Sequence, residues 1–310
     1  MTERLMLLDT ASLYFRAYFG VPDKVKAPDG TSVNATRGLL DIIAKLVTVY
    51  RPSQLVACWD DDWRPQWRVD LIPSYKAHRV VAEVAAAPDV EEVPDALQQQ
   101  VPLIREALDA LGIPIIGVPE HEADDVIGTL ATRATLPVDI VTGDRDLFQL
   151  VDDVRDVRVI YTARGMSNLD VVTDETVLER YGIRPTQYAD FATLRGDASD
   201  GLPGVKGIGE KTAASLLRMH GDLAAIRDAA QAGGLTGAAA ARVTEASDYL
   251  DVAPRVVRVA TDLDISAPGI ALGTLDGAAR QAAEALAERW NLGSSMSRAL
   301  TALASAEEAG

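Results

Sequence analysis

Short apolar runs recur along the first 161 residues of this chain, and segments with helical spacing separate them. The runs cover residues 5–8, 55–59, 113–118, 138–142 and 157–161. Apolar residues three and four apart mark two helical segments between them, at residues 39–47 and 97–111. Strands that alternate with helices and read as near-continuous apolar runs are typical of a mostly parallel sheet covered by helices. We therefore predict an α/β fold for this part of the chain.

Aspartates follow three of these runs, at Asp9, Asp60 and Asp144. In open α/β sheets, ligands bind beyond the carboxyl ends of the strands. A single Asp after a strand is ordinary turn chemistry. Three of them at the same predicted edge indicate a functional site.

A second group of acids, Glu122, Asp124 and Asp125, opens a helical segment, and Asp146 lies two residues after Asp144. Two like charges about 4 Å apart repel by roughly 4 kcal/mol at an effective dielectric of about 20. A converging group must therefore take up protons or bind cations, and oxygen ligands suit Mg²⁺. Acids in a first helical turn also complement the helix dipole, by about 0.3–1 kcal/mol each. Only the combination of both groups favours a metal site.

Composition limits the remaining choices. The 310 residues carry a net charge of −16, which opposes general polyanion binding, so a nucleic-acid partner would need local basic patches. The single Cys58 lies in an apolar run and is expected to be a buried thiol, and three scattered His residues form no local metal site. The sequence has no long uncharged apolar span and no signal-peptide pattern at its start, so we expect a cytoplasmic protein without membrane contact.

Residues 61–93 form a long insertion after a predicted strand, where functional loops often occur. Lys76 and Arg79 are three apart and are predicted to share a helix face. Tyr75 is a candidate for stacking on bases, which contributes about 1–3 kcal/mol per base in single-strand binders. The simpler alternative is a solvated basic face whose aromatic residues belong to the core.

The alternation ends near residue 181, where we place the boundary between a domain at 1–180 and a helical domain at 181–310. The second domain contains a segment rich in glycine and lysine at 204–211. A phosphate-binding P-loop requires Lys directly after its last Gly, but Glu210 stands there, so we reject nucleotide binding. We interpret the segment as a hairpin between two helices whose backbone N–H groups approach a DNA phosphate. Its predicted DNA-binding residues are Gly204, Lys206, Gly207, Gly209 and Lys211.

Five segments give this chain a resemblance to the flap endonuclease family, which includes the 5′-nuclease domain of bacterial DNA polymerase I. They occur in the family's order at residues 7–9, 75–79, 122–125, 142–147 and 196–212. The resemblance spans residues 5 to about 220 and implies a PIN-like domain, a helical arch at 61–93 and a helix–hairpin–helix domain. It implies a stand-alone structure-specific nuclease that hydrolyses 5′-flap, nicked or recessed DNA in replication and repair, with Mg²⁺ or Mn²⁺ as cofactor and K⁺ at the hairpin.

The resemblance also assigns residues to roles. Lys76 and Arg79 would contact the scissile phosphate, and Arg16 would assist. Asp60 is preferred over Asp61 as a metal ligand because it directly follows the apolar run. The implied metal ligands are Asp9, Asp60, Glu122 and Asp124 in one group, and Asp125, Asp144, Asp146 and Asp200 in the other, with Asp197 nearby.

Two other functions remain open from the sequence. One is a non-catalytic module that binds DNA junctions, and the other is a PIN-type ribonuclease with an accessory domain. The presence of every implied acid favours the nuclease over the first, and the hairpin favours DNA over RNA. DNA with a free 5′ end is the expected partner, replication and repair proteins are further candidates, and we expect a monomer.

Overall fold

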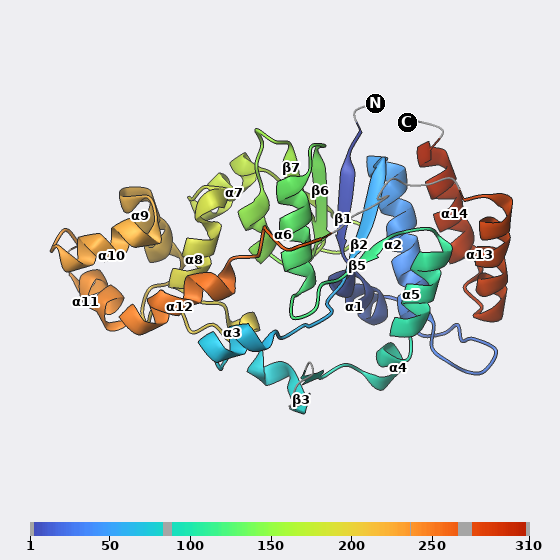
Figure 1. Cartoon of the computed structure of the whole chain (residues 1–310), viewed down its shortest axis with the longest axis horizontal. Helices are drawn as coiled ribbons and strands as arrows, with labels where there is room; N and C mark the ends of the chain where they lie inside the picture. The colour runs from blue at the N-terminus through green and yellow to red at the C-terminus, as the bar shows by residue number, and fades with distance from the viewer. Residues whose placement is uncertain (1–2, 83–88, 236, 266–274, 308–310) are drawn as a thin grey trace.

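A six-stranded sheet in the order β5-β2-β1-β6-β7-β8 forms the centre of the molecule (Figure 1). The computed structural model describes residues 3–82, 89–235, 237–265 and 275–307. Neighbouring strands are parallel except for the last pair, so the prediction of a mostly parallel sheet is confirmed. The strands are β1 (Leu5–Asp9), β2 (Gln54–Cys58), β5 (Ile115–Ile116), β6 (Val138–Thr142), β7 (Val157–Tyr161) and β8 (Asp170–Val172).

Helices cover both faces of this sheet, because successive residues of β1 point to opposite sides. Leu5 and Leu7 belong to one core with α6, whereas Met6 and Leu8 belong to another with α1, α2 and α5. Both cores are therefore anchored on the same strand. The bounds of these helices are α1 (Thr10–Gly20), α2 (Asn34–Tyr50), α5 (Val101–Ala110) and α6 (Ala123–Arg133).

The predicted single helix at 97–111 is divided into α4 (Asp95–Gln98) and α5. Pro102 lies in the first turn of α5, where its missing N–H costs nothing. Gln100, between the two helices, is fully buried, and its Oε1 accepts hydrogen bonds from the backbone N–H groups of Ala35 and Thr36 in α2. The break between α4 and α5 thus allows the Gln100 side chain to accept hydrogen bonds from backbone N–H groups in the first turn of α2.

The insertion after β2 contains α3 (Gln66–Leu71), the 3₁₀ turn η1 (Ala77–Arg79) and the antiparallel pair β3 (Val80–Ala82) and β4 (Val90–Glu91). Residues 83–88 lie outside the described part. The prediction that Lys76 and Arg79 share a helix face is wrong, because Lys76 has a left-handed backbone (φ 48°) and precedes a single 3₁₀ turn.

The helical domain of the structure comprises residues 174–257; it follows β8 and lies on one side of the sheet (Figure 1), whereas the predicted second domain covers residues 181–310. The glycine-rich hairpin runs from α8 to α9, so the predicted placement between two helices is confirmed. The elements of the helical domain are α7 (Asp174–Tyr181), η3 (Pro185–Gln187), α8 (Tyr188–Arg195), η4 (Ala198–Asp200), α9 (Glu210–His220), α10 (Leu223–Gln231), α11 (Ala238–Glu245) and α12 (Ser247–Val257).

The last two helices return to the sheet. Helices α13 (Gly277–Arg289) and α14 (Gly293–Glu307) pack against α5 and α2 on the side opposite the helical domain (Figure 1). Their apolar residues share a core with β1 and α2, whereas α9 to α11 belong to the other core. In the described ranges, no helix combines the length and the hydropathy needed to cross a bilayer.

We expect Phe148→Ala to destabilise the fold by about 3–5 kcal/mol, because it empties a fully buried position. Phe148 lies in the 3₁₀ turn η2 (Asp146–Leu150), and its ring contacts those of Tyr161, Tyr181 and Tyr188 at the junction of the two domains. Urea unfolding measures the loss. The control Leu178→Ala removes a side chain on a residue that is 55% exposed and should change stability by less than about 0.5 kcal/mol. Equal losses would contradict the core position of Phe148.

Candidate active site

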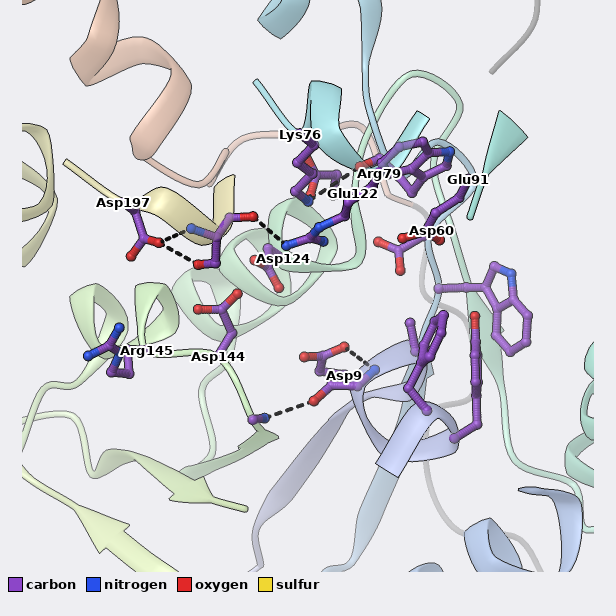
Figure 2. A pocket seen from close by; sticks show the side chains of 18 of the residues that line it. Asp9, Asp60, Lys76, Arg79, Glu91, Glu122, Asp124, Asp144, Arg145 and Asp197 are labelled. Carbon is purple, nitrogen blue, oxygen red and sulfur yellow. Dashed lines mark hydrogen bonds and ion pairs between the residues drawn. The ribbon is translucent and has the colours of Figure 1, made fainter. Parts of the chain in front are cut away.

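A cavity of about 630 Å³ opens at the carboxyl ends of β1, β2 and β6 (Figure 2). Two of the predicted phosphate-contacting residues, Lys76 and Arg79, lie on its wall. Figure 2 shows both beside Glu122 in the upper part of the view, with Asp60, Asp124, Asp144 and Asp9 below them. The predicted metal ligands on this wall are Asp9, Asp60, Glu122, Asp124, Asp144 and Asp197.

Strand register brings the first of these acids together. Asp9 ends β1, which pairs with β2 on one side and with β6 on the other. Its Oδ1 caps α1 by accepting from the N–H of Ser12, and its Oδ2 accepts from the Thr142 hydroxyl at 2.7 Å. Asp9 is thereby fixed at the floor of the cavity.

Asp60 and Asp61 have different positions although they are adjacent. Asp60 lines the cavity, and its Oδ1 accepts from the N–H of Ala123 at the start of α6 at 2.7 Å. The Asp61 carboxyl group instead covers Gly117, where a Cβ would come within 2.5 Å of it. The structure thus places Asp60, and not Asp61, at the site.

Burial raises the pKa of several of these carboxyl groups. The pKa of Asp9 rises from 3.8 to about 7, first through burial and then through the charge of Asp60. Burial also raises the pKa of Asp60 and of Asp200 to about 6. The pKa of Asp124 is raised well above its ordinary value by burial and by the charges of Asp9 and Asp144. The charge of one acid therefore raises the pKa of another across the cavity.

Glu122 is the exception among them. Burial alone would raise its pKa, but the charges of Lys76 and Arg68 outweigh that effect and hold the pKa below its ordinary value. Its Oε1 accepts from Arg68 Nη1 and from the Tyr75 hydroxyl, each at 2.6 Å, and its Oε2 pairs with Lys76. Glu122 is consequently neutralised by the insertion in this conformation.

This network bears on the predicted roles of Lys76 and Tyr75, which stay predictions. Lys76 is 9% exposed and occupied by Glu122, so in this conformation it does not present its ammonium group to a phosphate. Tyr75 is 3% exposed and packs in a core with Ile72 and Leu202, so its ring has no free face for a base. Lys76 and Tyr75 are held in these positions because the charge of Glu122 is buried, and a buried charge requires hydrogen-bonding partners where water is excluded.

Asp125 is a further predicted metal ligand. It is fully buried and is not among the residues that line the cavity. Its Oδ1 accepts from Arg68 Nη2 and from the N–H of Ala260, both at 2.8 Å, and its Oδ2 accepts from the N–H of Glu122. These contacts occupy the Asp125 carboxylate in this structure, and its assignment to the metal group stays a prediction.

The remaining predicted residues surround the cavity. Asp146 is buried and is not among the residues that line the cavity, and its Oδ1 has no hydrogen-bond partner in the described part of the chain. Asp200 is also buried and pairs with Arg79 at 3.3 Å. Asp197 pairs with Arg195 at 2.9 Å. Arg16 lines an adjoining groove, 3.6 Å from where a Cβ of Gly143 would lie.

The donor set suits a hard divalent cation, because it consists of carboxylate oxygens and includes the unpartnered Asp146 Oδ1. In the described residues, no group of three or more Asp, Glu, His or Cys side chains could hold an ion as it stands. The acids line a wall rather than converge on one point.

Sequence reasoning missed some residues of the site. Arg68 is 2% exposed and ties the insertion to α6 through Glu122 and Asp125. Glu91 lines the cavity from β4, and Tyr14 lines it from α1. An arginine and a glutamate in a charged insertion carry no periodic signal, so only the tertiary structure identifies them.

The hairpin residues lie apart from the cavity, beyond α8. Gly204 (φ 64°) requires glycine because a Cβ would come within 2.4 Å of the backbone N of Gly196. Lys206 and Lys211 are exposed, and a Cβ on Gly209 would meet open space. Gly207 also has a positive φ of 79°.

Comparisons with known proteins agree with this architecture. A family model described as 5′-3′ exonuclease, N-terminal resolvase-like domain, matches residues 4–182, and one described as 5′-3′ exonuclease, C-terminal SAM fold, matches residues 183–277. A 5′-3′ exonuclease of Streptomyces coelicolor is 62% identical over 96% of this chain and 99% of its own. A 5′-3′ exonuclease of Mycobacterium tuberculosis is 51% identical over 98% of each chain.

A solved structure has the same fold. The crystal structure of the bacteriophage T5 flap endonuclease, a pseudo-enzyme-product complex with DNA and metal ions, aligns with a TM-score of 0.62. It covers 97% of this chain and 99% of that one, at 17% sequence identity. The fold and these relatives define a nuclease, which hydrolyses phosphodiester bonds. The chain belongs to the 5′-3′ exonuclease family, as its sequence motifs implied.

We expect Asp125→Asn to destabilise the metal-free protein by about 3 kcal/mol, because it leaves a buried guanidinium short of a charged partner. Asp144→Asn should cost less than about 1 kcal/mol, because Asp144 is exposed and Asn still accepts from the N–H of Asp146. Urea unfolding in EDTA compares them. Similar losses in the two variants would contradict the separate roles.

The metal-free protein should lose stability as the pH rises from about 4 through about 7. The pKa of Asp9 is about 7 in the folded chain and 3.8 ordinarily, so the folded state binds more protons in that interval. Its stabilising contribution is complete below the lower value and is lost above the higher one. Urea unfolding midpoints in EDTA at several pH values measure this slope. Asp9→Asn should flatten it, and a curve parallel to that of the unchanged chain would contradict the assignment.

Proposed function

We propose that this chain is a structure-specific 5′-nuclease that cuts flapped, nicked or recessed DNA with the help of Mg²⁺ or Mn²⁺. The observation that carries the proposal is the cavity at the ends of β1, β2 and β6, whose wall contains Asp9, Asp60, Asp124 and Asp144. Mutual repulsion in this group, together with the raised pKa values of Asp9, Asp60 and Asp124, favours binding of divalent cations. When bound, such ions would lower the pKa of water and stabilise charge on a phosphate.

The residues of the chain divide the remaining work. Asp9, Asp60, Asp124 and Asp144 would hold the ions. Arg79, half-buried at the upper wall, would orient the phosphate, because its guanidinium offers planar paired donors. Asp200 and the carbonyl of Ser199 hold that guanidinium in place at 3.3 and 2.7 Å.

The hairpin supports a duplex as the substrate. Lys206 and Lys211 are exposed beside glycines that let the backbone approach a phosphate closely. Contacts of this kind fix position on DNA without reading its sequence, so specificity would come from the shape of the junction. DNA in the bacteriophage T5 complex is consistent with this use of the fold.

We further propose that the chain acts as a monomer in the cytoplasm. The single cysteine is a buried free thiol, which suits the reducing environment of the cytoplasm. The K⁺ ion at the hairpin, and replication and repair proteins as partners, stay predictions.

A labelled 5′-flap duplex incubated with Mg²⁺, Mn²⁺ or EDTA tests the proposal. We expect cutting with either ion and none in EDTA. Asp144→Asn should still bind the flap, but its cutting rate should fall by roughly 100- to 1,000-fold, because charge stabilisation at the phosphate is lost. Cutting at an unchanged rate would remove Asp144 from the site.

A matched pair of neighbours sharpens the assignment. Asp60→Asn should lose cutting, whereas Asp61→Asn should retain it, since Asp61 covers Gly117 and does not line the cavity.

The same flap made of RNA separates the two alternatives predicted from the sequence. Preferential cutting of RNA would favour a ribonuclease, and binding without any cutting would favour a non-catalytic module.

A further inference from the structure

Arg242 lies against the glycine hairpin although it belongs to α11, 35 residues further along the chain. Its Nη1 donates a hydrogen bond to the carbonyl oxygen of Gly207 at 2.8 Å. No sequence motif includes this arginine, because its spacing from the hairpin depends on how α10 and α11 fold back. Its contact with the hairpin is a feature of the tertiary structure alone.

Gly207 is shaped to accept this guanidinium. A Cβ at Gly207 would lie 2.8 Å from Cζ and 2.9 Å from Nε of Arg242, so any other residue would displace the arginine. The backbone of Gly207 also has a positive φ of 79°, which disfavours side chains independently. The hairpin therefore seats the guanidinium directly against its own backbone.

The charge of Arg242 is left uncompensated. Arg195 and Arg227 of the same domain, and Arg258 directly after it, each pair with an aspartate, whereas Arg184, Arg218 and Arg255 form no ion pair among the described residues and none of these three donates a hydrogen bond to the hairpin. Within the described residues, Arg242 is exposed, forms no ion pair and makes its single side-chain hydrogen bond to Gly207. A guanidinium has five N–H donors in a fixed fork that suits phosphate oxygens. Most of these donors remain free next to the exposed Lys206.

An unpaired arginine on the hairpin is notable in a chain with a net charge of −16, because the electrostatic field of the chain as a whole repels DNA. Duplex binding must then depend on a few local cations. We propose that Arg242 is a further phosphate-binding residue, seated on Gly207 and contacting one backbone phosphate of the duplex beside Lys206. The proposal rests on the proposed function, since it requires that the hairpin binds duplex DNA.

Fluorescence anisotropy with a nicked duplex in EDTA, at several salt concentrations, tests the proposal without cutting. Arg242→Gln should weaken binding roughly five- to tenfold at about 0.1 M salt and reduce the slope of log K against log[salt] by about 0.9, the value for one phosphate contact. Arg242→Lys should keep the slope but lose part of the affinity, because a lysine lacks the planar fork.

Arg280→Gln is the matched control. It removes the same charge from an exposed position on α13, at the opposite end of the molecule, and should alter neither the affinity nor the slope. Arg242→Gln behaving like Arg280→Gln would overturn the proposal. Weaker binding with an unchanged slope would also overturn it, because Arg242 would then only brace the hairpin. Failure of the unchanged chain to bind the duplex would instead refute the proposed function.

Discussion

Mutual repulsion among buried carboxylates is the constraint on which the site depends. The sheet brings Asp9 and Asp60 together at the ends of adjacent strands, and α6 adds Asp124 from the side. Each of these groups is held by burial and by its neighbours in a state that favours the proton-bound or cation-bound form. The packing that creates the two apolar cores therefore also stores unfavourable charge at one edge. Cation binding would relieve this repulsion.

The insertion compensates the negative charge of one carboxylate with protein cations instead of metal ions. Lys76 and Arg68 bring positive charge to Glu122 and neutralise it within the protein. A lysine and a divalent ion are alternative partners for one carboxylate. A phosphate that attracts Lys76 away from Glu122 would thus leave Glu122 available to an ion, so the position of the insertion and the state of the site are connected by one ion pair.

Much of the fold could be predicted because the relevant signals are local. The apolar runs at 5–8 and 157–161 correspond to β1 and β7, and the strand-end rule placed Asp9, Asp60 and Asp144 at one edge. The antiparallel strand β8 was missed because three residues carry little periodicity. The division of α4 from α5 depends on the buried amide of Gln100, whose partners lie in a different helix.

The details of the site were less predictable for a physical reason. Asp124 and Asp125 are adjacent in one acidic motif, yet the helix turns one toward the cavity and the other into the protein. Whether an acid of this motif is free to bind a metal ion depends on whether an arginine from another part of the chain pairs with it. Arg68 of the insertion pairs with Asp125 in this way. The same holds for Tyr75, because its burial depends on core contacts that its own segment does not encode.

Asp125 has a mechanical consequence for the whole molecule. Its carboxylate joins Arg68 at the base of the insertion, the N–H of Glu122 at the start of α6, and the N–H of Ala260 on the segment that leaves the helical domain. Three stretches remote in sequence thus share one acceptor group. Any displacement of the backbone at Ala260 would therefore be transmitted through this carboxylate to Arg68 and the insertion above the cavity.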